Sequence, residues 1–352
     1  MLAPCIAITM GDPSGVGPET IVGAWSDPEI RRVGRPFVVG HPAVIRRAVE
    51  LLCLPLEVVE IESPSEAAAN CRLVPVLRSG SDEAALVPPC AIDPRGGQAA
   101  YDALLLAARM ALAGEVAAIV TAPLHKAALW QAGHPYPGHT ELLAELCGVR
   151  DFAMMLYLGH DAQIRGPSGL AVVHVTLHMA LREVFEHLSI AEIVAKAQLA
   201  DRVMRRLMRG TVGEAAAAGT SNSRPRIGVC ALNPHAGEEG LFGDEETRLI
   251  LPAVVQAQAA GLDVQGPFPT DTLMVRARDG QFDAIVAMYH DQGHIALKLL
   301  GMHRAVNVTL GLPIVRTSVA HGTAFDLAWQ GRAETSSMVE AVRVAGLLAQ
   351  QR

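Results

Sequence analysis

The sequence predicts an α/β protein, and three observations support this class. Strand-like and helix-like segments alternate along most of the 352 residues, which is typical of a largely parallel sheet covered by helices. Half of the residues are hydrophobic but only 4% are aromatic, so the core must consist mainly of Ala, Val, Leu and Ile, as in buried parallel strands. The length fits about two domains of roughly 150 residues each.

The first part of the chain reads as a repeated strand and helix pattern. A strand over 4–10 is followed by a tight glycine-rich loop, and Pro18 suits the first turn of the helix that comes next. Further segments follow in order: strands at 36–40, 56–61, 73–77 and 116–122, and helices at 41–52 and 97–113.

The second part continues the alternation. A loop over 133–141 opens a helix, and strands at 152–158 and 170–175 form a pair. We predict a helix at 190–209, a mobile surface loop at 210–224, a helix beginning near 243 and a turn at 267–272. The remaining segments are strands at 226–232, 262–266, 284–288 and 305–310, a helix at 291–300 and a closing amphipathic helix at 334–350.

Composition excludes several function classes. A net charge of −7 and an isoelectric point near 6.0 argue against general affinity for nucleic acid or anionic membranes, which need a basic face. The six cysteines show no C-x-x-C spacing, so we expect reduced thiols in a cytoplasmic protein. No signal-peptide pattern opens the chain and no run approaches 18 apolar residues, so we expect neither secretion nor membrane insertion.

The loop after the first strand reads G-D-P-S-G-V-G-P-E, starting at Gly11. A glycine-rich turn after a first strand suggests contact with a phosphate, although its spacing is neither G-x-G-x-x-G nor that of a P-loop. A simple tight turn explains the pattern equally well. We name Gly11, Asp12 and Gly15 as candidate cofactor-binding residues.

The densest group of polar residues lies between 283 and 326, where two strand-like runs end and a short helix joins them. Strand ends in α/β proteins are where sites are built. This stretch supplies His290, Asp291, His294, Lys298, Asn307, Arg316 and His321. Such a set suits an anion site beside a metal or proton-transfer site, whereas a polar loop with one core histidine is the simpler alternative for any single member.

Two other segments supply further candidates. His139 and Thr140 begin a predicted helix, where free N–H groups and the helix dipole attract anions. Asp271, in the predicted turn, can face the same cleft as the strand-end residues named above. We name Lys298 and Asp271 as candidate catalytic residues.

Three histidines, His178, His235 and His290, each follow the end of a predicted strand. Imidazoles from separate strand ends are a common divalent-metal arrangement, and three protein ligands leave room for water or substrate. Histidines that only make hydrogen bonds remain the alternative. His174 lies within its strand, so we interpret it as a core residue and favour His178 as functional.

Six motifs together resemble the PdxA family, the 4-hydroxythreonine-4-phosphate dehydrogenases of pyridoxal phosphate biosynthesis and their paralogues. They are I-T-M-G-D-P-S-G-V-G-P-E, T-A-P-L-H-K, Y-P-G-H-T-E-L-L, N-P-H-A-G-E-E-G-L-F-G-D-E-E, A-M-Y-H-D-Q-G-H and V-N-V-T-L-G-L-P-I-V-R-T-S. The resemblance implies two α/β/α domains around a cleft, of the isocitrate/isopropylmalate dehydrogenase type, in a homodimer with shared active sites. We place the first domain at 1–135 plus 305–352 and the second, with most metal ligands, at 136–304.

The resemblance also implies roles. The divalent-metal ligands (Zn, Co, Mn or Mg) would be His178, His235 and His290, shared across the dimer, and the substrate contacts would be His139, Thr140, Lys298, Asn307 and Arg316. Arg316 offers the forked geometry that a phosphate favours. The implied reaction is oxidation of a secondary alcohol β to a carboxylate, with NAD or NADP as hydride acceptor, followed by loss of carbon dioxide.

Three departures leave the substrate open: His125 where the family usually has T-A-P-L-N-K, Thr270 where it has P-A-D-T, and Ala320 where it has S-V-D-H-G-T-A. Loss of a carboxylate at 320 could remove a contact to an amino group of the substrate. The alternatives are therefore 4-hydroxythreonine 4-phosphate, a threonate or erythronate 4-phosphate, and a carboxylated cis-dihydrodiol of the terephthalate type. A non-catalytic protein that binds a phosphorylated ligand is the remaining class, which would have no need of a metal.

Overall fold

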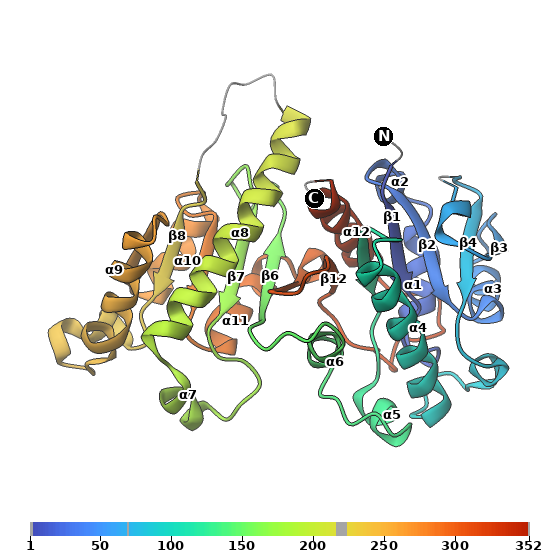
Figure 1. Cartoon of the computed structure of the whole chain (residues 1–352), viewed down its shortest axis with the longest axis horizontal. Helices are drawn as coiled ribbons and strands as arrows, with labels where there is room; N and C mark the ends of the chain where they lie inside the picture. Colours follow the sequence, from blue (N-terminus) through green and yellow to red (C-terminus); the bar gives the residue numbers. More distant parts are fainter. Residues whose placement is uncertain (1–2, 69, 216–223, 351–352) are drawn as a thin grey trace. The chain divides into compact units, whose positions relative to one another are not determined.

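The computed structural model describes residues 3–68, 70–215 and 224–350. The chain folds into two compact units (Figure 1), and six of the described β-strands lie in each. Of the described residues, unit 1 comprises those within 3–150 and 312–350, and unit 2 comprises those within 151–311. These limits differ from the expected boundaries at 135/136 and 304/305, because the helix beginning at His139 belongs to unit 1 and the strand ending at Leu310 belongs to unit 2.

The sheet of unit 1 is parallel, in the strand order β3-β4-β2-β1-β5-β12. Its strands are β1 (Cys5–Thr9), β2 (Arg35–Gly40), β3 (Glu57–Ile61), β4 (Leu73–Arg78), β5 (Ala118–Thr121) and β12 (Arg316–Val319). Its helices are α1 (Gly17–Ala24), α2 (Glu29–Arg32), α3 (Pro42–Leu51), α4 (Pro94–Leu112), α5 (Lys126–Gln131), α6 (His139–Leu146) and α12 (Ser336–Ala349), with short 3-10 turns η1 (Pro64–Glu66) and η2 (Asp82–Leu86).

Both faces of this sheet are covered, which explains its aliphatic strands. Helix α4 packs on β1, β2 and β5, while α12 packs on β12 and β5 and also contacts α1 and α2. Every residue of β1, β5 and β12 is buried. Burial on both faces favours the continuous Val, Ile and Ala runs from which the class was predicted.

The sheet of unit 2 has the order β11-β6-β7-β10-β8-β9, with antiparallel pairing of β6 to both β11 and β7 and parallel pairing elsewhere. Its strands are β6 (Ala153–Leu158), β7 (Leu170–His174), β8 (Ile227–Cys230), β9 (Val264–Phe268), β10 (Ala284–Ala287) and β11 (Val306–Leu310). Its helices are α7 (Leu181–His187), α8 (Ile190–Ala215), α9 (Leu251–Ala259), α10 (Thr270–Arg278) and α11 (His290–Gly301), with 3-10 segments η4 (Pro234–Gly240) and η6 (Met302–Arg304) and a π turn η5 (Glu246–Ile250).

The expected α/β class is confirmed, and the differences are local. The predicted loop over 210–224 is wrong for its first residues, because α8 continues to Ala215, and residues 216–223 lie outside the described part of the chain. The predicted turn at 267–272 is the end of β9 and the first turn of α10. Short helices such as α5 and α7 were missed because they span too few residues to show periodicity.

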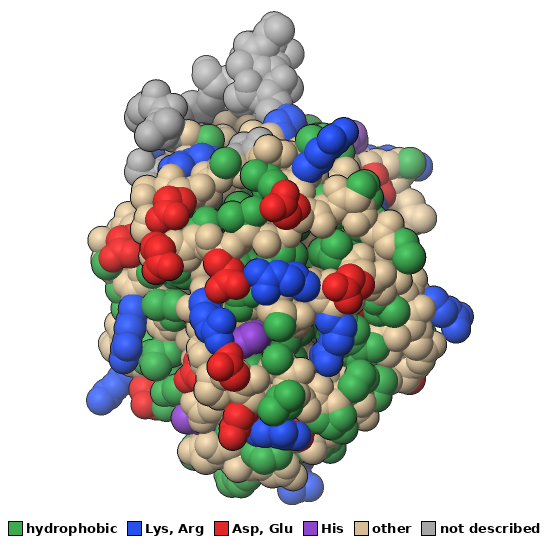
Figure 2. All heavy atoms as spheres, turned by 90° about the vertical axis from the view of Figure 1, so that its right-hand side faces the viewer, with side chains coloured by type: hydrophobic (Ala, Val, Ile, Leu, Met, Phe, Trp, Pro, Cys, Tyr) green, Lys and Arg blue, Asp and Glu red, His purple; other side chains and the backbone are tan. Residues whose placement is uncertain are grey.

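Surface charge is mixed. Figure 2 shows positive and negative side chains interspersed with apolar ones over one face of the molecule. In unit 1, ion pairs such as Arg46–Glu60 at 2.9 Å join opposite charges across exposed positions. None of the helices in the described ranges combines the length and the apolar character that crossing a bilayer requires.

Candidate functional site

In unit 2, the polar residues after β10 gather at the start of α11. His290 is the first residue of this helix, and its Nδ1 lies 2.7 Å from Oδ1 of Asp291. A carboxylate can only accept, so Nδ1 carries the proton and the lone pair of the neutral ring is on Nε2. A carboxylate on the far nitrogen of an imidazole is the usual support of a metal-binding histidine.

His178 lies close to His290. The two ring centroids are 5.7 Å apart, and both side chains line a cavity of about 290 Å³ between the start of α7 and the start of α11. Two imidazoles facing one cavity can hold a borderline divalent ion such as Zn²⁺ or Co²⁺, while Mg²⁺ prefers oxygen ligands. The donors present therefore fit part of a metal site.

His235 occupies a different place. It lies in η4, where residues 235–239 all adopt the left-handed backbone conformation, and its side chain is 73% exposed. Glu246 holds the start of this segment by accepting hydrogen bonds from the backbone N–H groups of Leu232 and Asn233 at 2.8 and 2.7 Å. Among the residues that the structure describes, no group of three His, Cys, Asp or Glu side chains is placed to bind a metal. The convergence of His235 with His178 and His290 in a dimer stays a prediction.

Two further histidines pack behind His290. His294 stacks on His290, with ring centroids 3.8 Å apart and planes 12° apart, and its Nδ1 lies 3.0 Å from Nε2 of His174. Nδ1 of His174 lies 3.4 Å from the carbonyl of Met154. Burial lowers the pKa of His174 to about 4 and that of His294 to about 3. The prediction of His174 as a core residue is confirmed, since it is fully buried at the end of β7.

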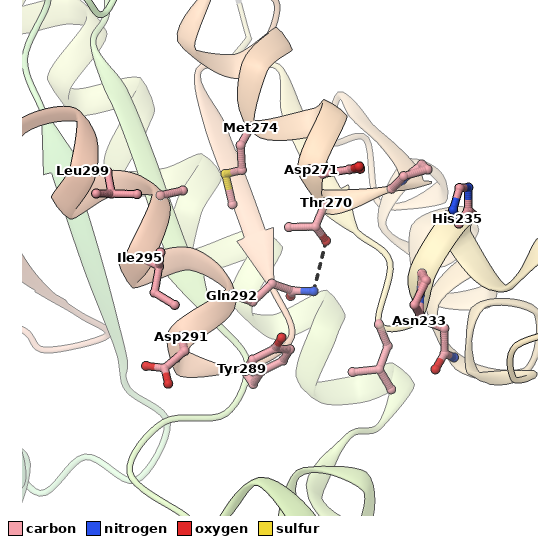
Figure 3. Close-up of a pocket in the computed structure, with 14 residues that line it drawn as sticks. Asn233, His235, Thr270, Asp271, Met274, Tyr289, Asp291, Gln292, Ile295 and Leu299 are labelled. Carbon is pink, nitrogen blue, oxygen red and sulfur yellow. Dashed lines mark hydrogen bonds between the residues drawn. The ribbon is translucent and has the colours of Figure 1, made fainter.

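A second cavity of about 750 Å³ lies beside α11 and contains His235 and Asp271 in its wall (Figure 3). The side chain of Gln292, in the wall of this cavity, bonds to residues on three segments. Its Nε2 donates to Thr270 Oγ1 at 3.0 Å and to the carbonyl of Ala231 at 2.7 Å, and its Oε1 accepts a hydrogen bond from Met288 N. These bonds fix the start of α10 against α11. Asp271, in the first turn of α10, is exposed. Gln292 and Thr270 were missed as members of this wall, because neither is a titratable or metal-binding side chain.

Lys298 and Asn307 also belong to unit 2. Lys298 is half-buried on α11, two turns beyond His290, and its charge contributes to lowering the pKa of His294, after burial and the neighbouring histidines. Asn307 lies on β11, and in the described part of the chain its Oδ1 is buried without a hydrogen-bond partner, while Nδ2 contacts the sulfur of Met154. An unsatisfied acceptor in a partly buried side chain suits a ligand that donates a hydrogen bond.

The remaining predicted substrate contacts belong to unit 1. Arg316 begins β12, is only 2% exposed, and donates from Nη2 to Thr121 Oγ1 at 2.7 Å. Burial lowers its pKa to about 10, with an opposing effect from Glu141. His139 and Thr140 begin α6, and the pKa of His139 is held well below its usual value by burial first and then by the charge of Arg316. Unit 1 therefore brings a forked cation, a neutral histidine and a helix start together, whereas the five-residue pocket that includes Lys298 and Asn307 stays a prediction.

The glycine-rich loop is a packed element of unit 1. Gly11 has a φ of 72°, and a Cβ there would lie 2.3 Å from the carbonyl oxygen of Pro123. A Cβ on Gly15 would lie 2.9 Å from Thr323. Asp12 is fully buried; its Oδ1 accepts from Ser14 N at 2.9 Å, and among the described residues its Oδ2 has no partner. Packing thus accounts for both glycines, and the cofactor contact of this loop stays a prediction.

Comparison with known proteins identifies the family. Residues 32–345 match the model of the family described as pyridoxal phosphate biosynthetic protein PdxA. The chain is 45% identical to a D-threonate 4-phosphate dehydrogenase of Salmonella typhimurium, over 98% of both chains. It is also 45% identical to a 4-hydroxythreonine-4-phosphate dehydrogenase of Trichlorobacter lovleyi, over 99% of this chain and 98% of the relative.

A solved structure shows the same architecture. A crystal structure of a 4-hydroxythreonine-4-phosphate dehydrogenase from Klebsiella pneumoniae has a TM-score of 0.82 and 41% identity, covering 99% of this chain and 100% of its own. The chain is equally identical to two relatives whose names give different substrates. Overall sequence identity therefore does not indicate which of these substrates this chain uses.

Proposed function

The chain belongs to the PdxA family, and from this premise we propose that it is a metal-dependent dehydrogenase that oxidises and decarboxylates a 4-phosphorylated, four-carbon 3-hydroxy acid with a nicotinamide cofactor. The observation that carries the proposal is Arg316, a forked cation that is 2% exposed and lies beside His139 at the start of α6. The planar fork of a guanidinium matches a phosphate, and charge-assisted hydrogen bonds of this kind are among the strongest in proteins.

Each unit contributes residues with a distinct role in the proposed reaction. In unit 1, Arg316, His139 and Thr140 bind the phosphate; in unit 2, His178 and His290 hold the divalent ion, with Asp291 keeping the Nδ1 proton on His290. Lys298 and Asp271 are the groups assigned to proton transfer at the reacting carbons. When bound, the divalent ion supplies Lewis acidity at the hydroxyl oxygen and the nicotinamide supplies the hydride acceptor.

Within the family, Ala320 favours a threonate-type acid. The position usually carries an aspartate, and here no carboxylate is available at 320 to meet an ammonium group. A 2-hydroxy acid such as threonate 4-phosphate needs no such partner. 4-Hydroxythreonine 4-phosphate, which carries an amine, is therefore the second candidate.

We further propose that the active form is a homodimer in which His235 of a second copy completes each metal site. Two features of unit 2 support this. His235 is largely exposed in the wall of the larger cavity, and Ile295 and Leu299 of α11, in the same wall, are 58% and 82% exposed. Exposed apolar side chains beside a cavity are typical of surfaces that another chain covers.

The test is a substrate screen in which turnover is measured by the absorbance of NADH or NADPH, with and without a chelator. Threonate, erythronate and 4-hydroxythreonine 4-phosphates and the terephthalate dihydrodiol would be offered to the full chain with NAD and with NADP. We expect the threonate-type phosphate to give the highest kcat/KM and the chelator to abolish its turnover. Turnover of the dihydrodiol alone, with no inhibition by the phosphorylated acids, would show that the phosphate assignment is wrong.

A further inference from the structure

Unit 2 contains a row of imidazoles that runs from the smaller cavity into the core. His178 and His290 line the cavity, His294 stacks on His290 at 3.8 Å, and His174 lies behind His294 with ring centroids 4.6 Å apart. His290 and His294 are four residues apart on α11, so they share one face of the helix. The proposed function uses the first two rings and leaves the last two without a role.

The hydrogen bonds of the inner pair have only one consistent direction when both rings are neutral. The carbonyl of Met154 can only accept, so Nδ1 of His174 carries a proton and its Nε2 is an acceptor. Nδ1 of His294, 3.0 Å from that acceptor, must then be the donor. Each ring is thereby held in one tautomer and one rotation, with strand β6 as the anchor.

Packing fixes the same arrangement from the helix side. A Cβ on Gly293 would lie 2.5 Å from Cγ1 of Val172 and 2.7 Å from Nε2 of His174, so α11 sits directly against β7. Two leucines would fill a core position without any hydrogen-bond requirement, whereas only a flat ring in a fixed plane can stack at 12° on the ring of His290. The pair is therefore better suited to orienting a neighbour than to filling space.

We infer that His174 and His294 are positioning residues that fix the ring plane of His290 and so preorganise His290 and His178 for the divalent ion. This rests on the proposed function, since it assumes that His290 binds metal. Asp291 fixes the Nδ1 proton of His290 and the His294 ring fixes its plane, so Nε2 of His290 is presented in one direction. Outer groups of this kind typically change metal affinity by about 10–100-fold when they are removed.

The experiment measures Co²⁺ binding to the metal-free, full-length protein by competition with a chromophoric chelator, together with the visible spectrum of the bound ion. His294→Leu removes both the ring and the hydrogen bond, and His294→Asn keeps an N–H near the Nδ1 position but removes the ring. His174→Gln keeps an acceptor near the position of Nε2. We expect both His294 variants to bind Co²⁺ about 10–100-fold more weakly with an altered spectrum, and His174→Gln to stay within a few-fold of the natural chain.

Two controls separate the possible outcomes. If His294→Leu does not fold, the double variant His174→Leu/His294→Leu leaves no unpaired imidazole and should show the same loss of affinity. Natural Co²⁺ affinity and an unchanged spectrum in a folded His294→Leu or double variant, with weak binding by His178→Ala, would overturn the positioning role alone. If His178→Ala binds Co²⁺ as the natural chain does, the proposed metal site is wrong and the positioning role falls with it.

Discussion

The two units present their candidate site residues in opposite ways. In unit 1, Arg316 is buried, bonded to Thr121 and placed beside His139, so the cation is already removed from water before any ligand arrives. In unit 2, His178 and His290 share a small cavity, while His235 is 73% exposed. Unit 1 of a single chain thus contains a preorganised centre for the proposed anion site, whereas the described residues of one chain provide only part of the proposed metal site.

This difference has a physical basis. A preorganised, desolvated cation can bind a phosphate strongly, because little reorganisation is needed and the local dielectric is low. A metal site divided between two copies would bind a divalent ion tightly only in the dimer. Ion binding would therefore stabilise the dimer, which has all the ligands, and not the separate copies.

The largest effect is expected from mixing two inactive variants. If each metal site takes His178 and His290 from one copy and His235 from the other, His178→Ala and His235→Ala should each abolish turnover as pure proteins. A mixed dimer of the two variants has one site with all three natural histidines and one site that lacks two, so activity should return when subunits are exchanged. NADH formation before and after mixing measures this.

The matched control mixes His178→Ala with His290→Ala. Both substitutions fall on the same side of the proposed site, so each site in the mixed dimer lacks one ligand and activity should stay absent. Equal recovery in both mixtures would contradict the shared site, and so would no recovery in either mixture when subunit exchange is demonstrated.

An intermediate effect is expected at Arg316. Charge-assisted contacts contribute roughly 1.5–3 kcal/mol each, so Arg316→Leu should raise the KM for the phosphorylated substrate by about one to two powers of ten, at roughly 1.4 kcal/mol per tenfold. Because burial of a cation away from water is itself costly, its replacement by an apolar side chain should leave the free energy of unfolding nearly unchanged while the affinity falls. Steady-state kinetics and denaturant unfolding test both statements.

Arg343→Leu is the control for this substitution. Arg343 is in the same unit and pairs with Glu340 on α12, where Nη2 lies 2.7 Å from Oε2. Its loss should leave KM unchanged. If Arg316→Leu lowers stability without changing KM, the arginine has a structural role and the phosphate site lies elsewhere.

The sequence predicted local structure well where burial or a backbone preference alone determined which residue type fits a position. Aliphatic runs predicted the buried strands, and Pro18 marked the first turn of α1. The position of His174 within the predicted strand separated this core histidine from His178, which follows the strand. Spacing could not show that His294 would pair with His174, because that contact joins α11 to β7 across 120 residues. Nor could it show that Gln292 and Thr270 link two helices, since amides and hydroxyls are common on any polar surface.

The smallest effect on activity is expected at Asp12, where the change concerns stability alone. Burial raises the pKa of Asp12 to about 6 from 3.8, with a smaller contribution in the same direction from Asp93 and an opposing hydrogen bond from Ser14 N. The folded state therefore binds this proton more tightly than the unfolded state does. Its contribution to stability is fully present below about pH 4 and is lost as pH rises through about 6, which amounts to about 3 kcal/mol at 1.36 kcal/mol per pKa unit.

Asp12→Asn keeps an oxygen to accept from Ser14 N and removes the titration. The variant should be more stable than the natural chain at pH 7 and should lose the fall in stability between pH 4 and 6. All three tryptophans, Trp25, Trp130 and Trp329, lie in unit 1, so denaturant unfolding followed by tryptophan fluorescence reports the unit that contains Asp12. Asp326→Asn, at an exposed position of the same unit, should keep the natural pH dependence. A natural pH dependence in Asp12→Asn as well would mean that Asp12 stays ionised in the folded protein.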